Sequence, residues 1–194
     1  MRNADLQLAI NSSRLKRVLA HWHEARGHRS MPMWQDIRPG KIKTELSIVW
    51  SYHYDALQDD FLGGIAGDAI QRLLGGPIKN AQFRQVHDAE PHFFTRAKKV
   101  LLTPAIFLGR GLLFRQHNRQ CFGERLILPF GGVDGRANGI FGATDYRFAH
   151  LYTSEPEVYG EVEHWFDLTV PAASLSISSS ERAHYPKNVT AEVA

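Results

Sequence analysis

Histidines near the amino terminus form the pattern in this sequence that most resembles a metal site. Residues 21–28 read His-Trp-His-Glu-Ala-Arg-Gly-His, which approaches the zinc-protease motif. That motif needs two histidines four residues apart, so that both face one metal ion from a helix. Here His23 and His28 are five residues apart, and Gly27 is expected to end the helix between them. His21 and His23 lie about 200° apart around a helix, so the spacing predicts no metal site.

Residues for covalent or phosphate chemistry are also poorly placed. Cys121 is the only cysteine, which excludes an internal disulfide and any multi-cysteine metal site. His117 is close to it in sequence but is predicted on the other side of a turn, and there is no nucleophile-elbow motif. The glycines of residues 63–67 match neither phosphate-binding loop. An enzyme would also require a buried acid–base pair in a cleft, and since the sequence offers no obvious pair, we expect no enzymatic activity.

Charge is distributed unevenly along the 194 residues, whose formal net charge is +3. Residues 1–44 hold nine lysines and arginines against three acidic residues, whereas residues 151–194 hold two against seven. A basic segment of this kind would bind nucleic acid through salt-dependent contacts with phosphates. No helix-turn-helix or base-stacking motif accompanies it. A basic nucleic-acid-associated regulator that uses this N-terminal segment is therefore the alternative function.

Length and composition indicate a soluble globular domain with extensions. Hydrophobic residues make up 43% of the chain, which is enough for a packed core. No apolar run reaches the roughly 18 residues of a membrane span, and no apolar signal core follows Met1. We therefore expect a cytoplasmic protein that is not inserted in a membrane.

The pattern of apolar residues predicts an α+β fold. Helical spacing from Leu8 to Trp22 predicts a first helix, and period-two alternation over residues 48–54 predicts a strand with one aromatic face. The further predicted elements are a partner strand at 61–66, helices at 69–74 and 90–102, and strands at 105–115, 121–129 and 139–146. This order is typical of a single antiparallel sheet with helices. Residues 157–170 fit a helix or a strand equally well.

We divide the chain into three parts on these grounds. Residues 1–44 form an N-terminal helical extension, and residues 45–150 form the central domain. Residues 151–194 form an acidic C-terminal extension, and its serine-rich, polar end is expected to be disordered.

Many weak motifs in a characteristic order lie between residues 15 and 147. They are Trp22, Arg26-Gly27, Pro32, Trp34, Asp36-Ile37, Pro39, Leu46, Phe61, Ala66-Gly67, Leu74-Gly75, Phe83, Leu128-Pro129 and Gly142. In this order and spacing the chain resembles a bacterial family of short proteins built around one PAS domain, although Asp68 stands where that family tends to have a small hydroxyl residue. The resemblance implies a PAS fold: a five-stranded antiparallel sheet with helices on one face, preceded by an N-terminal amphipathic helix. It also implies a non-enzymatic sensory or regulatory role in signalling, through a small ligand or a protein partner.

Haem and flavin are cofactors of some PAS domains. Haem is held there by a histidine on the long helix, but His92 falls in the first turn of that helix, next to His87. Residues 80–85 resemble the flavin motif of light-sensing relatives, but Ala81 stands in place of the reactive cysteine, and Cys121 is predicted on a distant strand. We therefore expect neither cofactor.

An apolar cleft between helices and sheet is where the resemblance places a small ligand. The candidate lining residues are Trp50, Phe61, Phe83, Phe93, Val100, Phe107, Phe114 and Phe141. The alternative for all of them is a plain hydrophobic core without a pocket.

An apolar stripe on the first helix lies outside the expected PAS core. It consists of Leu8, Leu15, Leu19 and Trp22. Such a stripe must pack on its own sheet, on the C-terminal tail or on a second copy of the chain. We expect a homodimer formed through this helix, and packing on its own domain is the alternative.

Overall fold

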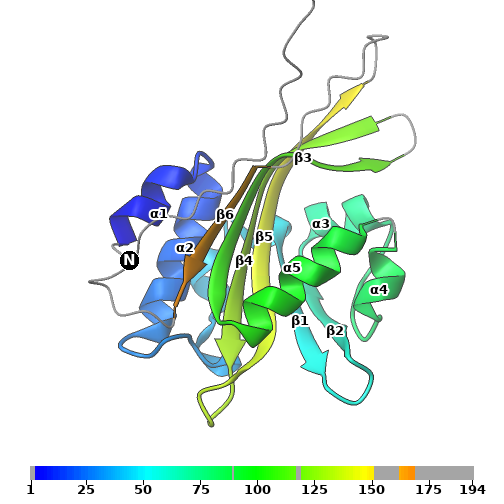
Figure 1. The fold of residues 1–194 in the computed structure, drawn as a ribbon. Coiled ribbons are helices and arrows are strands. Elements are labelled where there is room, and N and C mark those ends of the chain that lie inside the picture. The colour runs from blue at the N-terminus through cyan, green and yellow to red at the C-terminus, as the bar shows by residue number, and fades with distance from the viewer. Residues whose placement is uncertain (1–2, 89, 117–118, 151–161, 169–194) are drawn as a thin grey trace, which may run out of the picture.

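The computed structural model describes residues 3–88, 90–116, 119–150 and 162–168, and shows an antiparallel sheet with helices on both faces (Figure 1). The helices are α1 (Asn3–Ala9), α2 (Ser13–Arg26), α3 (Asp68–Leu74), α4 (Phe83–Val86) and α5 (Pro91–Leu102). The strands are β1 (Val49–Asp55), β2 (Asp60–Ala66), β3 (Ala105–Gln116), β4 (Arg119–Gly131), β5 (Ala137–His150) and β6 (Val162–Asp167). Short 3-10 turns lie at Trp34–Asp36, Pro39–Ile42 and Leu46–Ile48. No helix in these ranges is long and apolar enough to cross a membrane.

The sheet has six strands, in the order β2-β1-β5-β4-β3-β6, where five were predicted. The sixth is β6, which comes from the acidic C-terminal extension and pairs antiparallel with β3. Its residues alternate between the two faces: Phe166 packs with the core on one side and Trp165 with the core on the other. A strand that is covered on both faces lacks the simple polar–apolar alternation, which is why the sequence pattern did not separate helix from strand here.

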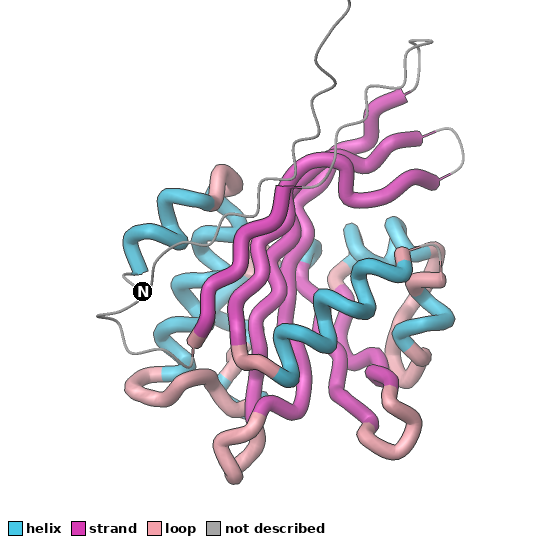
Figure 2. Tube along the Cα trace, viewed as in Figure 1, coloured by secondary structure: helices cyan, strands magenta, loops and turns pink. Residues whose placement is uncertain are grey.

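Helices cover both faces of the sheet, not one face as predicted (Figures 1 and 2). One core lies on the side of α1 and α2, and it includes Leu15, Leu19, Leu126, Leu128 and Phe141. The other core lies on the side of α3, α4 and α5, and it includes the aromatic face of β1. The expected N-terminal extension therefore shares a core with the sheet.

The predicted first helix is divided into α1 and α2. Ser12 caps α2 by accepting a hydrogen bond from the Leu15 amide (3.2 Å). At the same corner, the Glu124 carboxylate on β4 accepts hydrogen bonds from the amides of Asn11 (3.0 Å) and Ser12 (2.6 Å). Apolar periodicity continues across this corner, so the sequence pattern predicted one helix. The break between α1 and α2 is stabilised by Glu124 of the sheet, which the pattern does not reveal.

Candidate functional site

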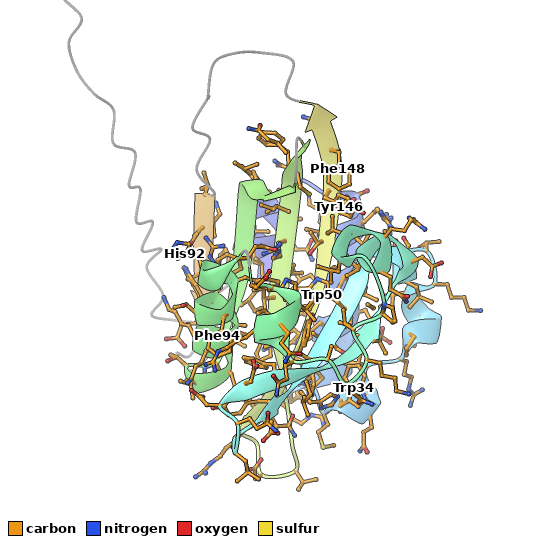
Figure 3. The ribbon with its side chains drawn as sticks, turned by 90° about the vertical axis from the view of Figure 1, so that its right-hand side faces the viewer. Trp34, Trp50, His92, Phe94, Tyr146 and Phe148 are labelled. Carbon is orange, nitrogen blue, oxygen red and sulfur yellow. The ribbon has the colours of Figure 1, made fainter. Side chains whose placement is uncertain are left out.

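A small cavity lies between the sheet and helices α3 and α5. Figure 3 views the molecule from this side and shows Trp50 at the centre of the layer. The cavity has a volume of about 20 Å³, which is roughly the space of a single water molecule. Its lining comes from six parts of the fold: Trp50, Tyr52, Ile70, Leu73, Leu74, His87, Glu90, Phe93, Arg125 and Thr144.

Four polar side chains are joined in a row along the cavity wall. The Tyr52 hydroxyl lies 2.9 Å from Nε2 of His87, and Nδ1 of His87 lies 3.6 Å from a carboxylate oxygen of Glu90. The other oxygen of Glu90 accepts a hydrogen bond from Nη1 of Arg125 (3.0 Å). The side chains of Arg125, His87 and Glu90 are only 3%, 5% and 14% exposed, so this is a buried polar network.

Local sequence explains how each member reaches the network. Tyr52 lies two residues after Trp50 on β1, so both rings face α3 and α5. Arg125 alternates with Ile127 on β4 and therefore faces the same core. Glu90 is the residue before Pro91, the first residue of α5; proline is well suited to that position and fixes where the helix begins.

Burial and neighbouring charges set the protonation states. Burial lowers the pKa of His87, in opposition to the nearby Glu90 carboxylate. Burial acts to raise the pKa of Glu90, but the charge of Arg125 and the contact with His87 outweigh it, so that this pKa lies below its ordinary value. Burial also raises the pKa of Tyr52. At neutral pH the network therefore holds one ion pair, between Glu90 and Arg125, beside an uncharged His87 and a protonated Tyr52.

Two nitrogens in this network lack hydrogen-bond partners within the described part of the chain: Nε of Arg125 and Nδ1 of His87. The Glu90 carboxylate on the Nδ1 side favours a proton on Nδ1, with Tyr52 donating to Nε2. Both orphan nitrogens are then donors. An unmet buried donor costs about 1–3 kcal/mol, so an acceptor oxygen that reached either nitrogen would be stabilised.

The predicted pocket residues separate into four groups. Trp50 and Phe93 line the cavity. Phe61, Phe83, Val100 and Phe107 are buried in the same core but do not line it. Phe141 lies in the core on the opposite face of the sheet, because its neighbour Ile140 takes the position toward α5. The backbone of Phe114 belongs to β3, and its side chain lies outside the described part of the structure.

The residues predicted at a dimer interface are mostly covered by the chain itself. Leu15, Leu19 and Trp22 are fully buried against their own sheet, which is the alternative named above. Trp22 also donates a hydrogen bond from Nε1 to the carbonyl oxygen of Pro129 (2.8 Å). Only Leu8, on α1, is exposed, at 81%.

Of the residues considered for cofactors and metals, His87 lines the cavity, whereas His92, Cys121 and His21 do not. His92 is exposed on the first turn of α5, as Figure 3 also shows. Cys121 is buried on β4, and burial raises its pKa to about 12. His21 accepts a hydrogen bond at Nε2 from the Arg38 amide (3.1 Å). Within the described ranges no three histidine, cysteine or acidic side chains are grouped as a metal site would require.

The polar network itself was missed at the level of sequence. The available signal was Arg125, a charged residue inside a predicted strand that the apolar run Leu126-Ile127-Leu128 follows directly. A buried arginine requires an acidic partner, but nothing in the sequence pairs it with Glu90, which is 35 residues away. His87 was noted only for haem, and Tyr52 only as part of an aromatic face.

Comparison with protein-family models gives a match over residues 10–145 to a family described as "PAS domain". The match covers more than half of the chain and includes every residue that lines the cavity. It stops before β6. No curated protein and no solved structure matches the chain.

Proposed function

Because the chain belongs to the PAS domain family, we propose that it is a non-catalytic sensory or regulatory module whose ligand is a small molecule bound between the sheet and α5. Occupation of the cavity shifts the population of conformations that the module presents to a signalling partner. The observation that carries the proposal is that two residues lining one cavity, Arg125 and His87, each hold a buried nitrogen without a hydrogen-bond partner among the described residues.

Helix α5 supplies a route from the cavity to the surface. Its first turn contributes Phe93 to the cavity wall. One turn further on, Arg96 forms an ion pair with Glu163 of β6 (2.6 Å), and the Lys99 ammonium lies 3.9 Å from the centre of the Trp165 ring. A displacement of α5 on ligand binding would therefore be felt by the edge strand β6.

The absence of catalysis is part of the proposal and rests on protonation. The buried Glu90–His87 pair is what an enzyme would need, but the pKa of each group lies below its ordinary value, so both are weak bases. Tyr52 and Cys121, considered as nucleophiles, have pKa values raised by burial. Both remain protonated at neutral pH and are poor nucleophiles.

Ion pairing weighs against the alternative of a nucleic-acid-associated regulator. Four of the nine basic residues in positions 1–44 pair with acidic side chains: Arg14 with Asp145, Arg17 with Glu45, Arg29 with Asp36 and Lys41 with Glu24. Each pair reduces the positive field that would attract phosphates.

Native mass spectrometry of freshly purified protein, compared with its denatured mass, tests the proposal. We expect a mass that is released on denaturation, and slower hydrogen exchange in α5 and β6 when it is bound. Leu74→Phe adds a ring to the cavity wall and should abolish retention of the ligand. The matched control is Leu102→Phe on α5, where Leu102 is 65% exposed. An empty wild-type protein, or full retention by the Leu74→Phe variant, would contradict the proposal.

A further inference from the structure

The buried guanidinium of Arg125 indicates the chemistry of the ligand, an inference that rests on the proposed function. We propose that the ligand is a small monocarboxylate with a short apolar body, and that its carboxylate replaces the side chain of Glu90 on Arg125. Glu90 then acts as an internal substitute that occupies the arginine while the cavity is empty.

The contact between Glu90 and Arg125 uses one terminal nitrogen of the guanidinium and leaves the side that carries Nε unused. Glu90 accepts one hydrogen bond, from Nη1 (3.0 Å), while Nε has no partner among the residues described. A guanidinium presents its donors as a planar fork that fits both oxygens of a carboxylate. Glu90 is tethered to the backbone and accepts from Nη1, whereas a free carboxylate can bind the side formed by Nε and Nη2 with both of its oxygens.

Charge balance favours exchange of carboxylates over addition of a second one. Arg125 is the only cation among the residues that line the cavity, and Glu90 is the only anion. A second anion beside Glu90 would leave a buried negative charge unpaired, which is strongly unfavourable. Exchange keeps one carboxylate on one guanidinium. A neutral ligand would not displace Glu90, because Arg125 would then lose its counterion.

Space and exposure lead to the same arrangement. About 20 Å³ does not hold a carboxylate in addition to Glu90, but departure of the Glu90 side chain would vacate the volume of one. Glu90 is the most exposed member of the network, at 14%, so its carboxylate lies near solvent. Trp50, Leu74 and Phe93 would form an apolar wall for the rest of the ligand, and Nδ1 of His87 would be a second donor.

Displacement of Glu90 would also explain how binding reaches α5. Glu90 is the N-cap residue of that helix and is joined directly to Pro91. Its ion pair with Arg125 ties the start of α5 to the middle of β4. Release of this tie would free the first turn of α5 while the ligand takes over the arginine.

Calorimetric titration with sodium propionate, and with propionamide as an uncharged probe of the same shape, tests this inference at constant ionic strength. We expect propionate to bind about tenfold or more tightly than propionamide, the effect of a hydrogen bond to a charged group. We also expect the Nε–H signal of Arg125 to shift in ¹⁵N NMR spectra. Glu90→Gln removes the competing charge but keeps an acceptor oxygen, so propionate should bind this variant more tightly than it binds the wild type.

Glu24→Gln is the matched control, because Glu24 of α2 is exposed and pairs with Lys41 at the surface, away from the cavity; propionate affinity should not change. Equal affinity for propionate and propionamide would overturn the carboxylate assignment and leave the ligand cavity standing. Weaker binding of propionate by the Glu90→Gln variant would overturn the displacement of Glu90. No response to propionate in either protein would overturn the inference, and a molecule found by native mass spectrometry would then still support the proposed function.

Discussion

A charged guanidinium inside a sheet must be neutralised, and Glu90 does this for Arg125 from the start of α5. The guanidinium carbon also lies 3.9 Å from the centre of the Phe93 ring, which adds a cation–π contact on the same helix. The arginine therefore depends on α5 twice, and removal of its anion should be costly.

Glu90→Ala is expected to lower the free energy of unfolding by about 3–5 kcal/mol, because it leaves Arg125 buried without a counterion. Arg125→Met combined with Glu90→Leu should recover most of that loss, since neither charge then remains. Urea denaturation of the wild type, Arg125→Met, Glu90→Leu and the double variant measures the coupling. A double variant as unstable as Glu90→Ala alone would argue against an ion pair at this site.

Acid should destabilise the protein well above the range in which carboxylates titrate. Burial lowers the pKa of His87 below 6.5, and burial together with Arg26 lowers that of His23 to about 4. Between pH 6.5 and each lowered pKa the unfolded chain binds a proton that the native state does not. As the pH is lowered through this range, the free energy of unfolding should therefore fall, by up to about 1.4 kcal/mol per pH unit for each histidine. Denaturant titrations at pH 7.5, 6 and 5 measure the slope, and His23→Gln should reduce it.

Among the elements, the corner between α1 and α2 is held by two carboxylates: Asp145 accepts a hydrogen bond from the Ser12 hydroxyl (2.6 Å), and Glu124 accepts from backbone amides. Glu124 of β4 is 6% exposed and accepts hydrogen bonds from the Asn11 and Ser12 amides and from Nε of Arg110 (2.7 Å). Arg110 in turn donates to the carbonyl oxygen of Ala9. The two helices are thus fixed to β3 and β4 at the point where the chain turns.

Glu124→Gln should lower the free energy of unfolding by about 1–3 kcal/mol, since charged hydrogen bonds to buried donors are lost. Hydrogen exchange should accelerate first in α1 and in the first turn of α2. Glu24→Gln is the control, because Glu24 is exposed and pairs with Lys41 at the surface; it should leave both measurements nearly unchanged. Uniform acceleration over the whole sheet would show that Glu124 supports more than this corner.

Local patterns predicted most of the elements. The pattern of apolar residues located β1 to β5, and period-two alternation identified β1. The packing of the N-terminal helices on one face of the sheet was not predictable. A helix with one apolar stripe packs equally well on its own sheet or on another chain. The same limit applies to the site, where Tyr52, His87, Glu90 and Arg125 meet only through tertiary packing.

At the scale of the whole molecule, Leu15, Leu19 and Trp22 are buried by their own sheet, so these side chains are not available to form the predicted homodimer interface. The dimer stays a prediction, and in this arrangement it would have to use other surfaces. Leu8 and Leu19 provide a matched pair on the same predicted stripe, since one is 81% exposed and the other is fully buried.

Leu19→Ala should lower the free energy of unfolding by about 2–5 kcal/mol, the usual cost of a cavity in a core, whereas Leu8→Ala should have almost no effect. Denaturation at several protein concentrations distinguishes the two arrangements. A cost for Leu19→Ala that disappears on dilution would show that the stripe packs on a second chain.

The pairing of β1 with β5 has a consequence for how the molecule folds. Ser51 of β1 lies opposite Phe141 of β5, so this strand pair joins segments that are distant in sequence. The pairs β1–β2, β3–β4 and β4–β5, by contrast, join strands that are neighbours in sequence. Loop closure over such a span is slow, and the two hairpin units should form before they dock. Trp50 and Tyr52 belong to one unit, and Arg125 and Thr144 to the other. The cavity is therefore created only by the docking step, and a bound molecule should slow its reversal, lengthening the lifetime of the native state without speeding its formation.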